Sequence, residues 1–325
     1  MTIKAFKTHS EQIELLKSRG MSFEFENAEA CTKDFFSRIG YYRLVNGYKE
    51  PFIKKTIHKD DEYKTGTTIK ELYSLYIFDD RLRELILKYV LKIETHIKSL
   101  IAYRISEQYG HDNYLRYGNF NSHKTNGNAE IISVIAEIHK SLSSRISDPS
   151  IKHYLTKYGY VPLWVLNNTL TFGAISKLYS IMEVRDRQYV SKKFNIPDSL
   201  LENFLMYLTK VRNIAAHGNR LYCMRNKHPI SDTTIHENLD ILKTSHGEYK
   251  TGKRDLFAAI IILRHLLSNN DFSKLINDLK LIMNQLDKGL NTISKGDITR
   301  IMGFPNNWEK IKTMSNKKSK IISAV

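Results

Sequence analysis

The segment Thr68–Tyr109, TIKELYSLYIFDDRLRELILKYVLKIETHIKSLIAYRISEQY, carries the longest helical pattern in the chain. Its apolar residues recur at spacings of three and four, which is the period of an α-helix that buries one face. Gly110 follows the last turn and is a residue type that commonly ends a helix. We therefore predict one long helix here. The residues that set its apolar face are Leu72, Leu75, Leu82, Leu85, Ile86, Tyr89, Ile93, Ile97, Leu100 and Ile101.

The polar side of this segment is basic, with Arg81 and Arg83 among its cations. A charged face on a long helix is usually only solvated, but these two arginines are also candidates for contact with RNA. Glu94 differs from them because it lies at the edge of the apolar face. Its carboxylate is therefore expected to reach a cation on a neighbouring helix.

The composition favours helices throughout the chain. Only six Pro and 15 Gly occur in 325 residues, which favours long helices over a turn-rich β fold. Hydrophobic residues make up 42%, enough for a substantial core. No stretch alternates apolar and polar residues for long enough to propose a sheet. We predict an all-α fold with an N-terminal helical segment at 1–67, a helical domain at 68–290, and a C-terminal extension with a basic tail at 291–325.

The stretch Arg212–Leu221, RNIAAHGNRL, ends a second helical pattern. At about 100° per residue, Arg212, Asn213 and His217 fall on one side of that helix. Arginine binds phosphate bidentately, and an imidazole can transfer a proton near pH 7. The amide of Asn213 is one turn before His217, so it is placed to orient the ring or to bind a sugar oxygen. We predict that these three residues form a catalytic site for a phosphodiester.

Neighbouring residues fit this interpretation. Arg220 extends the same face and is expected to support phosphate binding. The small side chain of Ala216 lies inside the polar arc and leaves room above the helix for a ligand or a second chain. Gly218 allows the helix to end at His217. The alternative is that the arginine and the histidine are simply solvated on an exposed helix face.

An aromatic motif, IGYYRLVNGY at Ile39–Tyr48, precedes the long helix. Tyr41 and Tyr42 beside Arg43 are candidates for stacking on unpaired bases. The favoured alternative is that the aromatic rings pack the N-terminal segment onto the main body. Both interpretations stay open from the sequence alone.

The charge balance points to a polyanionic partner. Lys and Arg number 50 against 34 Asp and Glu, which gives a net charge of +16 and a pI near 9.5. Nucleic acid is the commonest partner of a protein this basic. Lys317 and Lys318 lie in a basic tail of the kind that seeks polyanions. An acidic membrane surface is the competing partner, but the apolar face of the long helix is needed for the core.

Metal, disulfide and membrane functions are disfavoured. The chain has two cysteines, Cys31 and Cys223, which give no disulfide framework and no zinc pattern. Cys223 and His228 alone do not make a metal site. The first 20 residues lack the apolar stretch of a secretory signal, and no segment is apolar enough to span a membrane. We expect a cytoplasmic protein that uses no metal and no cofactor.

Residues 221–252, which follow the arginine–histidine stretch, are irregular in sequence. They contain Pro229, Gly247 and several His and Asn residues. Because loops often carry function, this segment is expected to be an active-site lid or an RNA-contacting loop.

Several short motifs occur together in one order. They are Ile39–Leu44, Leu75–Asp79, Leu82 with Arg83, Ile93 with Glu94, Pro162–Leu166, Thr171–Gly173, and Arg212–Leu221. In this combination the chain resembles the Abi-like proteins of bacterial abortive-infection phage defence, the AbiD and AbiF group. The resemblance extends over about residues 10–310.

This resemblance implies a HEPN-type helical fold and a metal-independent ribonuclease. The R-x4-6-H motif of HEPN proteins corresponds to Arg212 and His217, with Asn213 as its usual polar neighbour. The acidic position of the first HEPN helix corresponds to Glu94. HEPN ribonucleases assemble their site from two units, and this chain has one convincing motif, so a homodimer is implied. Members similar to AbiF also imply a toxin associated with a structured small non-coding RNA.

The resulting hypothesis is an endoribonuclease that leaves a 2′,3′-cyclic phosphate. His217 acts as general acid or base, Arg212 neutralises the charge of the transition state, and DNA is excluded because it lacks the 2′-hydroxyl. The alternative is a non-catalytic RNA-binding protein that acts by sequestering or releasing RNA or a partner.

Overall fold

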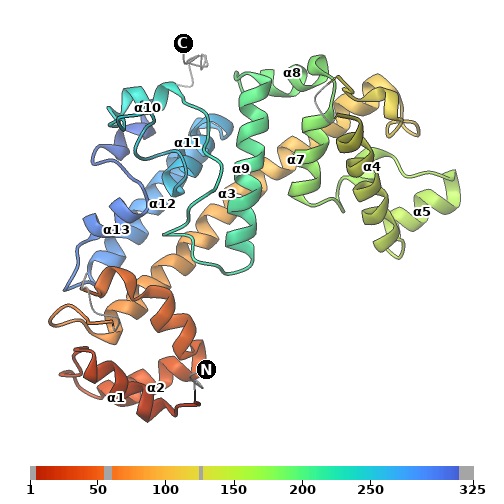
Figure 1. The fold of residues 1–325 in the computed structure, drawn as a ribbon. Coiled ribbons are helices and arrows are strands. Elements are labelled where there is room, and N and C mark those ends of the chain that lie inside the picture. The colour runs from red at the N-terminus through yellow and green to blue at the C-terminus, as the bar shows by residue number, and fades with distance from the viewer. Residues whose placement is uncertain (1–4, 55–60, 124–126, 315–325) are drawn as a thin grey trace.

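The computed structural model describes residues 5–54, 61–123 and 127–314 (Figure 1). Within these ranges the regular elements are helices, and β-structure is limited to isolated bridges such as the one between Phe120 and Met182. The prediction of an all-α fold is confirmed. Lys317 and Lys318, predicted to bind RNA, lie outside the described residues.

Helix α3 (Ile69–Tyr109) is the longest element and connects the two ends of the molecule (Figure 1). Its first turn is closed by a capping box, in which the side chains of Thr68 and Glu71 each accept a backbone N–H of the other residue. Gly110 ends the helix with a φ of 84°. The apolar side of α3 is buried along its whole length. The sequence pattern therefore predicted this helix and its buried face correctly.

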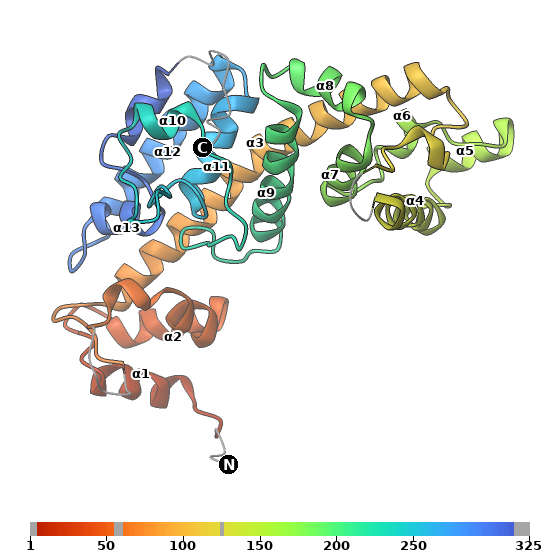
Figure 2. The same ribbon diagram turned by 45° about the horizontal axis from the view of Figure 1, so that its top comes forward.

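The other helices gather at the two ends of α3 and around its middle (Figures 1 and 2). At its N-terminal end lie α1 (His9–Ser18), α2 (Ala28–Ile39), a π-helical turn at Tyr42–Asn46 and a 3-10 turn at Glu50–Phe52. At its C-terminal end lie a 3-10 turn at Tyr117–Asn119, α4 (Gly127–Ser144), α5 (Pro149–Tyr158), α6 (Leu163–Leu166), α7 (Phe172–Ile181) and α8 (Val184–Lys192). The middle is covered by α9 (Asp198–Ala216), α10 (Thr234–Asn238), α11 (Leu256–Leu266), α12 (Asn269–Asp287), α13 (Lys295–Ile301) and a 3-10 turn at Trp308–Lys312.

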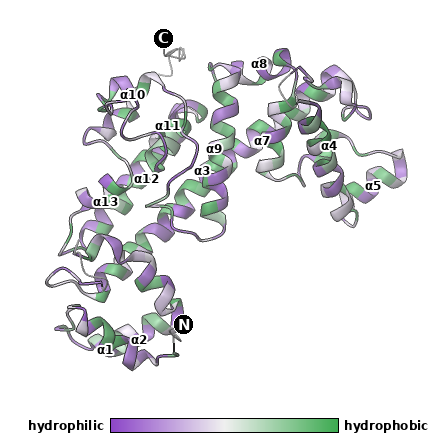
Figure 3. Ribbon diagram, in the orientation of Figure 1, coloured by the Kyte–Doolittle hydropathy of each residue, from purple (hydrophilic) through white to green (hydrophobic). Residues whose placement is uncertain are grey.

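Helix α9 packs on α3 and α7 through one apolar side, on which Phe204, Leu208 and Val211 are 0% exposed. Helix α11 packs against α9 and is buried at every one of its residues, as expected for a helix that is hydrophobic on nearly all sides (Figure 3). Because the apolar side of α9 is held in the core, its other side faces outward. Asn213 is exposed on that outer side, and His217 is exposed just beyond its end.

Residues 221–252 combine core and surface positions. Residues 225, 227, 228 and 242–248 are exposed, so the prediction of an active-site lid or RNA-contacting loop stays a prediction. Leu221, Tyr222 and Ile230 are at most 1% exposed. The ring of His236 is 0% exposed, and its Nε2 lies 2.9 Å from the carbonyl oxygen of Gly252. The apolar residues here follow no helical or strand period, so periodicity gave no sign of their burial.

The chain between α4 and α5 shows how one helix ends and the next begins. Helix α4 ends at Ser144, and Asp148 with Pro149 starts α5. Asp148 is the N-cap of α5, and its carboxylate accepts the backbone N–H of Ser150 at 2.9 Å. Proline in the first turn is compatible with helix because its missing N–H would have no partner there.

The carboxylate of Asp79, on α3, holds three separate parts of the chain together. It is 0% exposed. Its oxygens accept the hydroxyl of Tyr48 at 2.9 Å and the backbone N–H groups of Leu221 at 3.0 Å and Tyr222 at 2.8 Å. The guanidinium of Arg83 lies 2.7 Å from the same carboxylate. One buried side chain thus fixes the N-terminal segment, α3 and the chain that follows α9.

Arg83 is therefore not the surface RNA contact that the sequence suggested. Its side chain is 4% exposed and is paired with Asp79 and with Asp80. Burial raises the pKa of Asp79 above its ordinary value, while Arg83 and the N–H donors oppose that rise. Arg81 is exposed and donates a hydrogen bond to Gln285 on α12, so it remains a candidate for contact with a partner.

Replacing Asp79 by alanine is expected to lower the free energy of unfolding by about 3–5 kcal/mol, because it leaves Arg83 buried without its main partner. Chemical denaturation would measure the loss. The matched control is Asp80→Ala, whose side chain is 48% exposed, and which should cost less than about 1 kcal/mol. Equal losses for the two variants would show that Asp79 is not the contact that holds these segments together.

Candidate functional site

The predicted catalytic residues lie together at the C-terminal end of α9. The helix ends at Ala216, and His217 is its C-cap, with its backbone N–H bonded to the carbonyl oxygen of Asn213 at 3.0 Å. Asn213, Ala216 and His217 are exposed, whereas the side chain of Arg212 is 30% exposed. An arginine, an amide and an imidazole therefore reach the same end of one helix.

Gly218 makes this helix end possible. Its φ is +67°, in the left-handed region that residues with a Cβ rarely adopt. A Cβ built on Gly218 would also lie 3.0 Å from Nη2 of Arg43. The glycine therefore turns the chain away from α9 directly after His217 and leaves the imidazole at the end of the helix.

Glu94 on α3 is the acidic neighbour of this site. Its carboxylate is 8% exposed and lies 3.7 Å from Nε of Arg212 and 2.9 Å from Nζ of Lys98. Lys98 also donates to the carbonyl oxygen of Leu170 at 2.6 Å. Neither Oε2 of Glu94 nor Nε of Arg212 has a hydrogen-bond partner among the described residues. The carboxylate thus attracts Arg212 by its charge, at a distance longer than a hydrogen bond. It does not form a hydrogen bond with Nε of the guanidinium.

The N-terminal segment contacts the same end of α9. Nη2 of Arg43 lies 3.4 Å from the carbonyl oxygen of Gly218, where a cation is favoured by the helix dipole. Nη1 of Arg220 donates to the carbonyl oxygen of Gly47 at 2.7 Å. Arg220, predicted to support phosphate binding, is therefore partly engaged in joining the two segments. Sequence reasoning did not detect these contacts because they link residues more than 170 positions apart.

The aromatic motif is divided between core and surface. Tyr48 is 2% exposed, and the ring of Tyr41 packs edge-on against Phe36 at 5.3 Å between centroids. Tyr42 is 75% exposed, next to the exposed Arg43. Most of these rings therefore pack the N-terminal segment onto the main body. Tyr42 and Arg43 are the residues of the motif that remain accessible to a ligand.

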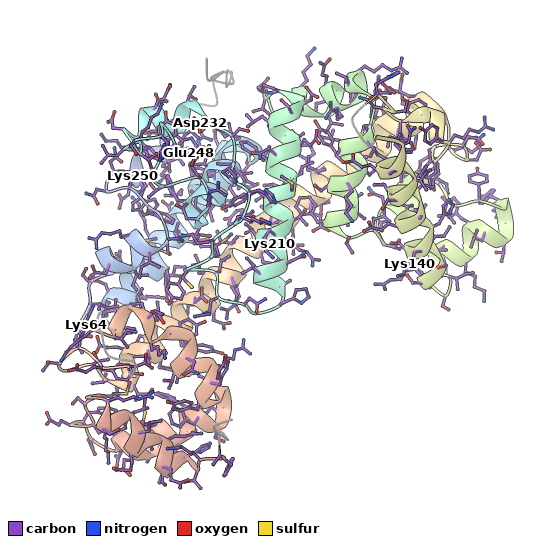
Figure 4. All side chains as sticks on the ribbon, in the orientation of Figure 1. Lys64, Lys140, Lys210, Asp232, Glu248 and Lys250 are labelled. Carbon is purple, nitrogen blue, oxygen red and sulfur yellow. The ribbon has the colours of Figure 1, made fainter. Side chains whose placement is uncertain are left out.

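A basic groove borders the site on the other side. It has a volume of about 470 Å³ and lies between α9 and residues 225–229. Asn213 and Lys210, the latter labelled in Figure 4, line this groove from α9. Its other cationic and polar lining residues include Arg225, Lys227, His228 and Asn203, and no carboxylate is among the residues that line it. This groove could not be predicted from the sequence, since its two walls come from different segments.

No cluster of three or more His, Cys, Asp or Glu side chains suitable for a metal ion occurs in the described ranges. Cys31 and Cys223 are free cysteines. None of the helices within residues 5–54, 61–123 and 127–314 combines the length and apolar character needed to cross a bilayer. The side chains gathered at the end of α9 are a guanidinium, an amide and an imidazole, with the carboxylate of Glu94 on α3 beside the guanidinium.

Replacing Gly218 by alanine is expected to lower the free energy of unfolding by about 1–2 kcal/mol, because a left-handed residue with a Cβ is strained. Thermal or chemical unfolding would measure this. Gly118→Ala is the control, since a Cβ there meets no atom within 4 Å, and its effect should stay within about 0.5 kcal/mol. An unchanged stability of Gly218→Ala would argue against this helix end.

Comparison with known proteins places this architecture in a family. The family model described as Abi-like protein matches residues 34–223, a range that includes Arg43, Glu94, Arg212 and His217. Searches among curated proteins and among solved structures gave no significant match. The matched range covers more than half of the 325 residues. The chain belongs to the Abi-like protein family, which implies a function in abortive infection, a bacterial defence against phage.

Proposed function

We propose that this protein is a metal-independent HEPN-type endoribonuclease that acts as the toxin of an abortive-infection system. The observation that carries the proposal is the joint placement of Arg212, Asn213 and His217 at the end of α9, with Glu94 3.7 Å from Arg212. A fixed cation and a titratable ring beside it are the groups that phosphodiester cleavage requires. The net charge of +16 supports RNA as the partner.

The reaction begins when the ribose 2′-oxygen attacks the adjacent phosphorus. The 2′-hydroxyl proton passes to a base, the bond to the 5′-oxygen breaks, and that oxygen takes up a proton. The products are a 2′,3′-cyclic phosphate and a 5′-hydroxyl. His217 carries out one of the two proton transfers, Arg212 stabilises the charge on the phosphoryl oxygens, and Asn213 positions the strand. Glu94 keeps Arg212 oriented toward the phosphate.

One copy of the chain offers one imidazole at this place, whereas the reaction uses a base and an acid. A homodimer that brings two α9 ends together supplies both. Ala216 supports this arrangement because it is exposed between Asn213 and His217 and presents only a methyl group. The composite site then contains two copies each of Arg212 and His217.

The bound RNA extends from the site along the basic groove. Lys210, Arg225 and Lys227 line this groove together with Asn213. Cations there bind phosphates without reading sequence, which suits both a target strand and a structured small non-coding RNA held by the protein. Tyr42 with Arg43 offers a ring and a guanidinium for an unpaired base.

Replacing His217 by alanine is expected to reduce the rate of RNA cleavage by about 10²–10⁴-fold, because proton transfer is lost. Purified protein, a labelled RNA and analysis of the cyclic phosphate ends would measure the rate. RNA affinity should change little, since the groove cations remain. His139→Ala, an exposed histidine of α4, is the control and should cleave normally. Undiminished cleavage by His217→Ala would remove this residue from the chemistry, and absence of cleavage in the parent protein would favour the non-catalytic RNA-binding alternative.

Replacing Ala216 by arginine is expected to separate the proposed dimer, because it adds bulk and like charges where two α9 ends meet. Light scattering after size-exclusion chromatography would measure the mass, and the cleavage assay would show a parallel loss of activity. Ala136→Arg, on the exposed side of α4, is the control. A variant that stays dimeric and cleaves at the parent rate would contradict the paired arrangement.

A further inference from the structure

A second and larger cavity lies beside α3, on the side toward α6. Its volume is about 900 Å³. Figure 2 shows α6 next to the C-terminal part of α3, and the two helices are in contact. The lining includes Thr95, Lys98 and Ser106 from α3, and Trp164 and Asn167 from α6 and the residue that follows it. None of the predicted site residues lines this cavity.

Two residues that line the cavity have buried polar atoms without hydrogen-bond partners among the described residues. Asn167 is 5% exposed, and its Oδ1 has no hydrogen-bond partner among the described residues. The same holds for Oγ of Ser106 on the opposite wall. Buried side-chain polar atoms in folded proteins are nearly always hydrogen-bonded, and an exception calls for an explanation. A ligand that donates a hydrogen bond to Asn167 would provide one.

Aromatic rings line the same cavity. Trp164 is 48% exposed and Tyr103 is 59% exposed, although both are large hydrophobic side chains. Exposed rings at the rim of a cavity are suited to stacking on a flat ligand. Rings together with a buried amide oxygen fit a heteroaromatic ligand that carries N–H groups on its edge. Nucleobases have this combination of a stacking face and a donor edge.

The cavity is also linked to the candidate site. Lys98 lines it, and Nζ of Lys98 lies 2.9 Å from the carboxylate of Glu94, whose other oxygen faces Arg212 at 3.7 Å. A ligand in the cavity would therefore lie next to Lys98, the ion-pair partner of the carboxylate that faces Arg212. Glu107, at the rim, is paired with Arg104 at 2.9 Å, so its charge is partly balanced.

We propose that this cavity is a nucleobase-binding site, in which a base stacks on Trp164 or Tyr103 and donates an N–H to Oδ1 of Asn167. The inference rests on the proposed function in so far as the base belongs to an RNA strand held at the end of α9. In that case the cavity contributes to the base specificity of the protein. Binding of the base is then transmitted to Arg212 through the ion pairs of Lys98 and Glu94.

The test uses tryptophan fluorescence of the full-length His217→Ala protein, so that no RNA is cleaved. The chain has two tryptophans, and Trp308 is 7% exposed and outside the cavity. Titration with each nucleoside 5′-monophosphate and with a short single-stranded RNA should quench Trp164 in a saturable manner. Quenching by the mononucleotides would show that a free nucleotide is enough to fill the cavity. Quenching by the RNA but not by the mononucleotides would show that the base must be part of a strand.

Asn167→Leu is the discriminating variant, because it keeps the volume of the side chain and removes the unpartnered oxygen. It should retain or raise the melting temperature of the free protein but weaken base binding about tenfold or more. Tyr158→Ala, with the same 48% exposure as Trp164 but outside the cavity, should bind normally. Unaltered affinity in Asn167→Leu, or no quenching by either class of ligand, would overturn the proposal. Because quenching does not depend on cleavage, this result is independent of whether the protein proves to be a nuclease.

Discussion

The position of the candidate site depends on one buried carboxylate, that of Asp79. It binds Tyr48 and the backbone N–H groups of Leu221 and Tyr222, so it fixes the chain just after α9 against both α3 and the N-terminal segment. The contacts of Arg43 with Gly218 and of Arg220 with Gly47 follow from this placement. The exposed imidazole of His217 is thus carried by a helix end held on two sides.

Glu94 fixes the position of the Arg212 guanidinium as Asp79 fixes the end of α9. It is nearly buried on α3, yet it faces Arg212 on one side and Lys98 on the other. A buried carboxylate between two cations is better compensated than one in a single pair, and it gives Arg212 a fixed direction without occupying its terminal nitrogens. Its partner Lys98 lines the cavity that also includes Trp164 and Asn167, so two ion pairs connect the two proposed binding places.

The sequence was sufficient for features set by local periodicity and by residue chemistry. It predicted α3, the helix end at His217 and the position of Glu94 at the edge of an apolar face, because each depends on residues within a few turns. It failed for Arg83, whose charge is buried in the network around Asp79, and for the buried residues within 221–252, which follow no period. The basic groove and the cavity beside α6 could not be predicted, since their walls come from segments far apart in the chain.

The most direct measurement of the central claim is a structure of the protein bound to an RNA with a 2′-deoxy substitution at the cleavage position, which removes the nucleophile. The account predicts that the phosphate on the 3′ side of that sugar lies within hydrogen-bond distance of Arg212 and of His217 from one or both copies. A complex in which the strand passes over another surface, with these side chains free of RNA, would contradict it.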